Sequence, residues 1–286
     1  MILTAVAILG GVGLFFAILI AIANRRLKVW EDPRIDGVTA LLPGANCGAC
    51  GRPGCRAFAE ALVKGEAQPA GCNVMNADAA GVVARYLGVD AGEARKKVAR
   101  LLCAGGTHVT TQRAEYRGYA SCAAAAAVAG GGKGCAWGCL GLADCERACT
   151  FGAISMNADG LPAVDVEKCT ACGDCVTACP KGLFTVLPLD ARLLVQCRNL
   201  VNGNEALEEC RVACTACGKC VQDAAPGLIS ITSGVAVVNY DLIGLAEERA
   251  TERCPTGAIV WLLGAQFAGV RGMSMANAEA IGGSSR

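Results

Sequence analysis

The sequence predicts an α+β protein with one membrane-spanning helix, a small four-cysteine module and two tandem modules of cysteine loops, the second of them degenerate. Three observations predict this organisation. Residues 2–23 form an unbroken apolar stretch, 20 cysteines are spread over the rest of the chain, and the cysteine pattern after residue 122 recurs 75 residues later. Such a density of cysteine requires either disulfide bonds or metal.

The N-terminal apolar stretch is long enough to cross a bilayer as a helix, which takes about 20 residues. Arg25, Arg26 and Lys28 follow it directly and no basic residue precedes it, whereas a signal peptide carries its charge before the apolar region. By the positive-inside rule, residues 1–24 are expected to be a single-pass, lipid-embedded anchor in the plasma (inner) membrane, with the soluble part cytoplasmic. Thiols stay reduced in that compartment, so the cysteines indicate metal rather than a disulfide scaffold.

The most specific motif is CTACGDCVTACP at residues 169–180, which has the Cys-x2-Cys-x2-Cys-x3-Cys-Pro spacing of bacterial ferredoxins. Three closely spaced thiolates can wrap a cuboidal [4Fe–4S] cluster, while the fourth, held by the rigid Cys-Pro step, points to a second cluster. A structural zinc ion would instead favour two well-separated cysteine pairs around a tetrahedron. The motif therefore predicts an electron-carrying cluster rather than zinc.

The first soluble module is predicted at residues 41–102, after a polar linker over residues 25–40. The expected ligands of its [4Fe–4S] cluster are Cys47, Cys50, Cys55 and Cys72. The first three lie in a Gly- and Pro-rich loop, which cannot be helical and lets the backbone fold closely round a cluster. The fourth is alternatively a small buried residue. Segments 56–64 and 79–102 are expected to form short helices that pack over the site.

A repeat dominates the rest of the chain. Five cysteines recur at the same interval, as the pairs Cys122 and Cys197, Cys135 and Cys210, Cys139 and Cys214, Cys145 and Cys220, and Cys179 and Cys254. The surrounding sequence matches as well, since CPKGLF corresponds to CPTGAI and FGAISM corresponds to PGLISI. Such a repeat predicts two copies of one ferredoxin-like module, at residues 135–190 and 191–264, with residues 103–134 as a connecting segment.

The two copies differ in their ligands. The first has two loops of four cysteines, Cys135, Cys139, Cys145 and Cys149, and Cys169, Cys172, Cys175 and Cys179. The positions that match Cys149, Cys169, Cys172 and Cys175 in the second copy hold Ala224, Gly244, Glu247 and Ala250. Because the fourth cysteine of each loop binds the other loop's cluster, these four losses belong to one cluster. The second copy is therefore predicted to keep one cluster, with the ligands Cys214, Cys217, Cys220 and Cys254.

The first loop of the first copy is irregular, since Leu142 stands where the second copy has Cys217, and Cys135 is expected to replace the missing ligand. Four clusters would use 16 of the 20 cysteines. The remainder are Cys103, Cys122, Cys197 and Cys210, which either ligate a fifth cluster or are buried or reserve thiols. The tail over residues 265–286, rich in Ala, Gly and Ser, is expected to be mobile or to dock on a partner.

Composition excludes several classes of function. The 26 basic and 25 acidic residues nearly balance, so nothing indicates binding to nucleic acid. Aromatic residues make up only 5% of the chain, which predicts a thin core and a large contribution of cluster binding to folding. No nucleotide motif or acid–base constellation is present, so no catalytic residue is expected.

An N-terminal anchor, then ANCGACGRPGC, then CAWGCLGLADC followed by ferredoxin loops, resembles the B subunits of the Rnf ion-translocating electron-transport complexes over nearly the whole chain. The resemblance implies a subunit of an ion-transporting ferredoxin:NAD oxidoreductase that accepts electrons from soluble ferredoxin and passes them through [4Fe–4S] clusters to other membrane subunits. NAD would be reduced at another subunit, with coupled Na⁺ or H⁺ translocation. The chain departs from the family at Cys149-Thr150, where Cys-Pro is usual, and in its degenerate second module.

Two other functions remain open at this point. Iron–sulfur subunits of other membrane oxidoreductases, such as hydrogenases or molybdoenzymes, also duplicate ferredoxin loops, but they normally lack the first four-cysteine module. A scaffold that delivers clusters would be expected to hold them labile and exposed, with no fixed membrane partner.

Overall fold

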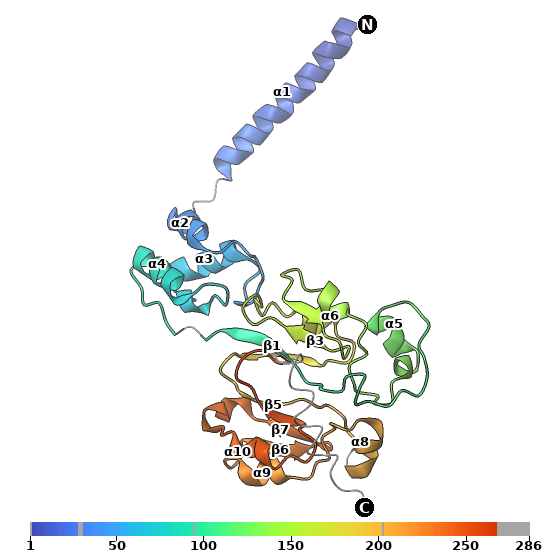
Figure 1. Cartoon of the computed structure of the whole chain (residues 1–286). Helices are drawn as coiled ribbons and strands as arrows, with labels where there is room; N and C mark the ends of the chain where they lie inside the picture. The colour runs from blue at the N-terminus through green and yellow to red at the C-terminus, as the bar shows by residue number, and fades with distance from the viewer. Residues whose placement is uncertain (1, 28–30, 94, 202, 268–286) are drawn as a thin grey trace, which may run out of the picture.

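The computed structural model describes residues 2–27, 31–93, 95–201 and 203–267. Helix α1 (Ile2–Arg26) extends away from the remainder of the protein (Figure 1). Its segment Val6–Arg26 has a mean hydropathy of 2.7 and no part of it is buried. The predicted N-terminal apolar helix is thus confirmed, and its exposed apolar surface fits a lipid environment.

Below α1 in Figure 1 lies the four-cysteine module, built from α2 (Arg34–Leu41), α3 (Cys55–Val63), the short 3-10 turn η1 (Pro69–Gly71) and α4 (Ala77–Leu87). Its core contains Val38, Phe58, Leu62 and Val83. The helix predicted over residues 56–64 is confirmed as α3. Residues 34–41, expected to be linker, instead form a helix, because Ile35 and Val38 are apolar at helical spacing and pack against α3.

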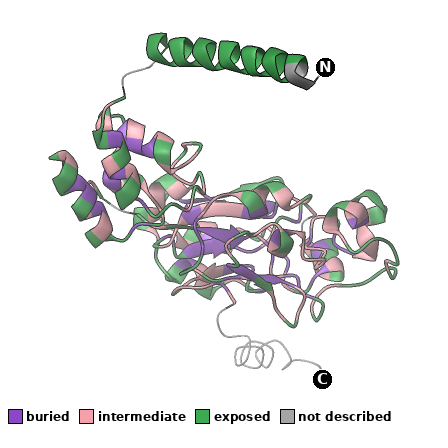
Figure 2. Cartoon of the chain, turned by 90° about the horizontal axis from the view of Figure 1, so that it is seen from above, coloured by how far each residue is buried: buried purple, intermediate pink, exposed green. Residues whose placement is uncertain are grey.

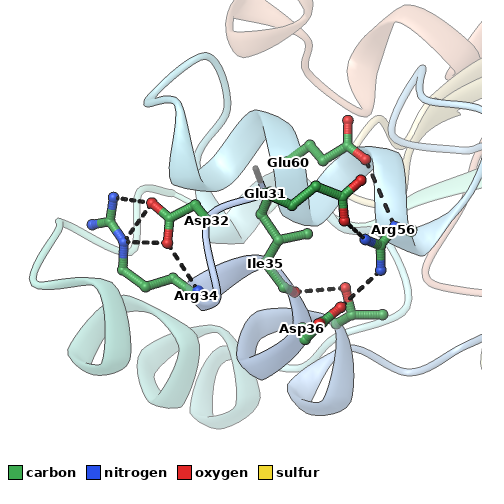
Figure 3. A network of polar contacts seen from close by, with 8 residues as sticks. Glu31, Asp32, Arg34, Ile35, Asp36, Arg56 and Glu60 are labelled. Atoms are coloured by element: carbon green, nitrogen blue, oxygen red, sulfur yellow. Dashed lines mark hydrogen bonds and ion pairs between the residues drawn. The ribbon is translucent and has the colours of Figure 1, made fainter. Parts of the chain in front are cut away.

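A network of exposed ion pairs fixes α2 against α3 (Figure 3). The Arg56 guanidinium lies 2.5 Å from the Glu31 carboxylate and 2.8 Å from that of Asp36. Glu60, one turn further along α3, lies 3.9 Å from the same guanidinium. The network orients the end of the module from which the chain leads to the anchor, although each such exposed pair contributes at most about 1 kcal/mol.

The segment after α4 differs from the expected helix. It forms strand β1 (Lys97–Leu101), which pairs antiparallel with β4 (Phe184–Pro188). Val98 and Leu101 are buried in the core of the following module. The strand depends on a partner more than 80 residues away, which local periodicity could not reveal.

Residues 97–190 form module one and residues 191–264 form module two, which lie one below the other in Figure 1. Module one also contains α5 (Cys122–Ala127), η2 (Ala129–Gly132), α6 (Asp144–Arg147), β2 (Ile154–Met156), β3 (Pro162–Val164) and α7 (Asp174–Ala178). Module two contains β5 (Leu193–Val195), α8 (Gly203–Glu209), α9 (Lys219–Asp223), β6 (Ile229–Thr232), β7 (Val235–Val238), η3 (Tyr240–Leu245), α10 (Arg249–Glu252) and β8 (Ile259–Trp261). Both have the same plan of two antiparallel pairs, β1 with β4 and β2 with β3 in the first, β5 with β8 and β6 with β7 in the second.

Strand pairing shows how the two modules correspond. Leu102 N donates to Leu183 O over 2.7 Å just after β1, and Gln196 N donates to Ala258 O over 2.7 Å just after β5. The cysteine that follows β1, Cys103, is therefore the structural counterpart of Cys197. The sequence repeat pairs Cys197 with Cys122 instead, but Cys122 lies in a longer connection that module two lacks.

The C-terminal part of the described chain returns to β1. Gln266, only 2% exposed, accepts a hydrogen bond from Leu101 N and donates one to Leu101 O, at 2.9 and 2.7 Å. Its amide thus replaces a neighbouring strand at the free edge of β1. The tail expected from residue 265 therefore begins with a docked segment, and residues 268–286 lie outside the described residues. Figure 2 shows the buried strands at the centre and the exposed α1 apart from them.

Candidate iron–sulfur centres

Two cysteine loops have the same backbone shape. The sequences CTACGDC and CTACGKC both place an alanine and a glycine at positive φ, with Ala171 at 60° and Gly173 at 92°, and Ala216 at 54° and Gly218 at 73°. A positive φ is uncommon for alanine and reverses the chain direction locally. Each loop thereby gathers its three cysteines around a common pocket and continues into a short helix.

The first of these pockets lies in module one and has a volume of about 330 Å³, part of it open to solvent. Its cysteines are Cys149, Cys169, Cys172 and Cys175. Burial, together with smaller contributions from the charges of the other three cysteines, raises the pKa of the Cys175 thiol to about 12. Backbone N–H groups donate to two of the sulfurs, Ala153 N to Cys149 at 3.3 Å and Ala99 N to Cys169 at 3.5 Å. The fourth cysteine thus comes from the other loop, as crossed ligation predicts.

The second of these pockets lies in module two, has a volume of about 350 Å³ and contains Cys214, Cys217, Cys220 and Cys254. In the repeat it corresponds to the site of Cys139, Cys145 and Cys179. Cys217 is exposed, whereas Cys214 and Cys220 are buried. Burial raises the pKa of Cys220 to about 11, helped by the charges of its three neighbours. At Cys254 burial also acts to raise the pKa, but hydrogen bonds from backbone N–H groups and the Thr256 hydroxyl outweigh it and lower the pKa. The protein thus stabilises a thiolate at this position.

The four-cysteine module has a pocket of about 340 Å³ that holds Cys47, Cys50, Cys55 and Cys72 together. Asn46 accepts a hydrogen bond from Cys55 N at 2.8 Å and so fixes the loop against the start of α3. The four cysteines expected to share one cluster therefore converge on one space.

The irregular first loop of module one takes its extra cysteine from an unexpected position. Burial raises the pKa of Cys145 to about 12, and the charges of Cys122 and Cys179 contribute to this rise after burial. Asp144 accepts hydrogen bonds from Ser121 Oγ and Ala123 N, at 2.9 and 3.0 Å, and so holds the start of α5 beside Cys145. These contacts bring Cys122 near Cys145, in the part of the loop where Cys135 was expected.

Cys135 belongs to another group. It lines a pocket of about 320 Å³ together with Cys103, Cys197 and Cys210. Burial raises the pKa of Cys197 to about 12 and that of Cys210 to about 11. Three of the four cysteines left over by the sequence pattern therefore converge here, and no spacing rule could have found them because they come from separate segments.

The donor set fits iron–sulfur clusters. All 20 cysteines are free thiols, and four pockets of nearly equal size each contain four of them. Within the described part of the chain, no three potential ligands lie close enough together to hold a single metal ion. A cubane binds each thiolate to a different iron and so keeps the sulfurs apart, whereas zinc draws four ligands to one centre.

A buried cation on β1, whose charge interacts with that of Cys169, also fits an anionic group in module one. Arg100 is 1% exposed, and its Nη1 donates to Gly264 O at 2.7 Å. Its Nε and Nη2 have no hydrogen-bond acceptor among the described residues. Burial lowers the pKa of Arg100, while the charges of Cys169 and Tyr240 oppose that shift. An unpaired buried guanidinium is costly, so an anionic cluster held by Cys169 would supply the missing countercharge.

The fold and the pockets together define a class, a protein with an N-terminal apolar helix and several cysteine sites suited to [4Fe–4S] clusters. Family comparisons agree with that class. A family described as "Putative Fe-S cluster" matches residues 42–74, and one described as "4Fe-4S binding domain" matches residues 161–184.

Relatives of known name match nearly the whole chain. It is 46% identical over 90% of its length, and 77% of the relative's, to the B subunit of the Na(+)-translocating ferredoxin:NAD(+) oxidoreductase complex of Acetobacterium woodii. It is 36% identical over 87% of its length, and 88% of the relative's, to the B subunit of the proton-translocating ferredoxin:NAD(+) oxidoreductase complex of Clostridium ljungdahlii. The B subunit of the ion-translocating oxidoreductase complex of Methanosarcina acetivorans is 36% identical over 84% of the chain and 90% of its own. The chain belongs to this family of Rnf complex B subunits.

Proposed function

We propose that the chain is the membrane-anchored electron-transfer subunit of an Rnf-type complex. It accepts electrons from reduced ferredoxin and relays them to membrane subunits that reduce NAD with coupled ion translocation. The observation that carries this proposal is the set of complete four-cysteine pockets on a chain that ferredoxin:NAD oxidoreductase subunits match over most of its length. The named relatives translocate different ions, so the family by itself does not choose between Na⁺ and H⁺.

We infer four [4Fe–4S] sites. Three rest on pockets that contain four cysteines each, and the fourth rests on the contacts that bring Cys122 near Cys145. We assign them to Cys47, Cys50, Cys55 and Cys72; to Cys122, Cys139, Cys145 and Cys179; to Cys149, Cys169, Cys172 and Cys175; and to Cys214, Cys217, Cys220 and Cys254. A bound cluster would supply reversible one-electron chemistry at each site. The chain's own groups bind it, donate N–H hydrogen bonds to sulfur and limit the access of water, which together set the potential.

The order of the modules supports a direction of flow. Module two lies farthest from α1, and its pocket contains the exposed Cys217, so it is suited to receive electrons from a soluble donor (Figure 1). The four-cysteine module lies next to α1 and is suited to pass them to membrane subunits. Arg25 and Arg26 at the end of α1 support a cytoplasmic position for the soluble part.

Stopped-flow mixing of the purified, cluster-loaded chain with reduced ferredoxin tests this function under anaerobic conditions. We expect the clusters to become reduced, as seen by electron paramagnetic resonance, and to remain bound during gel filtration with an iron chelator. Cys217→Ala should slow the first phase, whereas Cys50→Ala, at the opposite end of the chain, should leave it unchanged. Loss of iron to the chelator without reduction would favour a cluster-delivery scaffold. Reduction by quinol or hydrogenase partners but not by ferredoxin would favour another membrane oxidoreductase.

A further inference from the structure

The pocket at the junction of modules one and two has a symmetric origin. Cys103 and Cys135 come from module one, and their structural counterparts Cys197 and Cys210 come from module two. The two cysteines of each pair occupy the same positions relative to the repeated strands. Each module thus contributes one half of a four-cysteine site that neither module contains alone.

The hydrogen bonds to sulfur repeat in the same way. Cys103 Sγ accepts from Gly105 N and Cys139 N, both at 3.4 Å. Cys197 Sγ accepts from Asn199 N at 3.4 Å and from Cys214 N at 3.3 Å. Both sulfurs are therefore held by the N–H two residues later and by the N–H of a cysteine assigned to the neighbouring cluster. Such bonds favour a thiolate over a thiol.

The space between the sulfurs is kept open. A Cβ atom at Gly105 would lie 2.9 Å from Thr110 Cγ2, 3.3 Å from Cys210 Sγ and 3.5 Å from Cys103 Sγ, so a side chain there would crowd two of the four sulfurs as well as Thr110. The pocket's volume, about 320 Å³, lies close to the 330–350 Å³ of the three pockets that contain the other complete sets.

A positive charge lies beside the pocket. The Lys133 ammonium donates to Gly105 O at 2.6 Å and to Cys139 O at 2.5 Å, and so bridges the loop of Cys103 to the loop of the adjacent site. Its charge acts on Cys135, Cys139 and Cys210 in the direction that stabilises their thiolates. Lysine in this position balances part of the negative charge that four thiolates and a cluster bring to a buried site.

We propose that Cys103, Cys135, Cys197 and Cys210 bind a fifth [4Fe–4S] cluster at the junction between the two modules. A cluster held by these four cysteines would supply one-electron transfer between the neighbouring sites of modules two and one, with no bond made or broken in the protein. This relay role rests on the proposed function, whereas the binding of the cluster does not. The same four ligands also tie the two modules together.

Iron and acid-labile sulfide in paired variants of the full chain, purified anaerobically, test the proposal. The module-one pair Cys103→Ala with Cys135→Ala and the module-two pair Cys197→Ala with Cys210→Ala should each remove about four of about twenty iron atoms. Combining all four substitutions should remove no more than either pair, because both halves serve one cluster. The control pair Cys122→Ala with Cys139→Ala should remove a different cluster, so its loss should add to that of either test pair.

Additive losses from the two test pairs, or no loss of iron from either, would overturn the proposal. So would stoichiometric zinc in the wild-type chain at this site. Gly105→Val keeps all four thiols but fills the space between them, and it should remove the same cluster even if the cysteine variants fail to accumulate. A full iron content in Gly105→Val would likewise contradict the proposal. The iron content of these variants does not depend on ferredoxin. It would therefore still test the fifth site if the proposed function were wrong.

Discussion

Modules one and two have the same strand plan, yet the four cysteines that line one pocket of the first are replaced in the second by Ala224, Gly244, Glu247 and Ala250. In module one, Ala153 lines the pocket of Cys149, Cys169, Cys172 and Cys175. Its counterpart in the repeat, FGAISM against PGLISI, is Leu228, which is fully buried in the core of module two. A larger apolar side chain therefore occupies the region where the other module keeps space for a cluster.

The charged groups differ in the same direction. Arg100 on β1 lies opposite Thr185, and the matching pair of module two is Leu194 opposite Val260. Leu194 is completely buried, as Arg100 nearly is. The module that has lost four ligands has thus also replaced the buried cation by an apolar residue. This agrees with a cluster as the countercharge of Arg100, since without an anion a buried guanidinium only costs free energy.

An ion pair has been added where the cluster is missing. Asp223 at the end of α9 lies 2.6 Å from Arg253, just after α10, and their counterparts in module one are Ala148 and Ala178. Module two thus holds its helices together with side chains, whereas module one is expected to do so with a cluster. The comparison indicates that a cluster and a set of packed side chains can substitute for each other within one fold.

The largest effect is expected when the leucine that fills this region of module two is introduced at the matching position of module one. Ala153→Leu should displace the cluster of Cys149, Cys169, Cys172 and Cys175, because the leucine of module two occupies the corresponding region. Iron should fall by about four atoms per chain. Ala153→Ser, which adds little volume, is the matched control. Full iron content in Ala153→Leu would mean that Leu228 does not take the place of a cluster in module two.

The reverse change should destabilise module two without affecting any cluster. Leu228→Ala removes a fully buried side chain and should cost about 2–5 kcal/mol of unfolding free energy. Hydrogen exchange of the β6 and β7 amides measures that loss, with iron analysis to verify the cluster content. Exchange unchanged in β6 and β7 would show that this leucine is not a central part of the core.

Replacing Arg100 by the residue of module two should change a potential rather than a cluster count. Arg100→Leu removes the cation whose charge interacts with that of Cys169 and should disfavour the reduced, more negative cluster by about tenfold, which is about 59 mV for a one-electron couple. A potentiometric titration followed by electron paramagnetic resonance measures the shift. Arg100→Lys should retain most of the wild-type potential. If Arg100→Leu and Arg100→Lys had equal potentials, the charge at position 100 would not stabilise the reduced cluster, and the proposed charge compensation would be wrong.

The smallest effect concerns the ion pair that only module two contains. The hydrogen bond from Arg253 lowers the pKa of Asp223, so the pair contributes stability above the usual aspartate pKa of about 3.9 and loses it as pH falls through the lowered value. Asp223→Asn should therefore speed hydrogen exchange in α9 and α10 slightly at pH 7, with the difference from wild type unchanged down to about pH 4 and narrowing only below it. A difference that stays constant with pH would exclude the ion pair as its cause.

The sequence by itself determined the features that depend on near neighbours. The apolar length of residues 2–23 predicted α1, and the spacing of Cys169, Cys172 and Cys175 predicted a loop that gathers three thiols. Crossed ligation followed as well, because the motif itself directs its fourth cysteine to another cluster, and Cys149 does lie with those three. The repeat also indicated that four ligands had been lost together from one site.

Only the tertiary structure decided which distant cysteines meet. Asp144 holds Cys122 beside Cys145, and the pairing of β1 with β4 makes Cys103 equivalent to Cys197. It also brings Cys135 to the junction of the modules, away from the loop in which sequence order placed it. The physical reason is that a cluster joins thiols by their positions in space, and those positions follow from strand pairing and side-chain contacts between segments that are far apart in the chain.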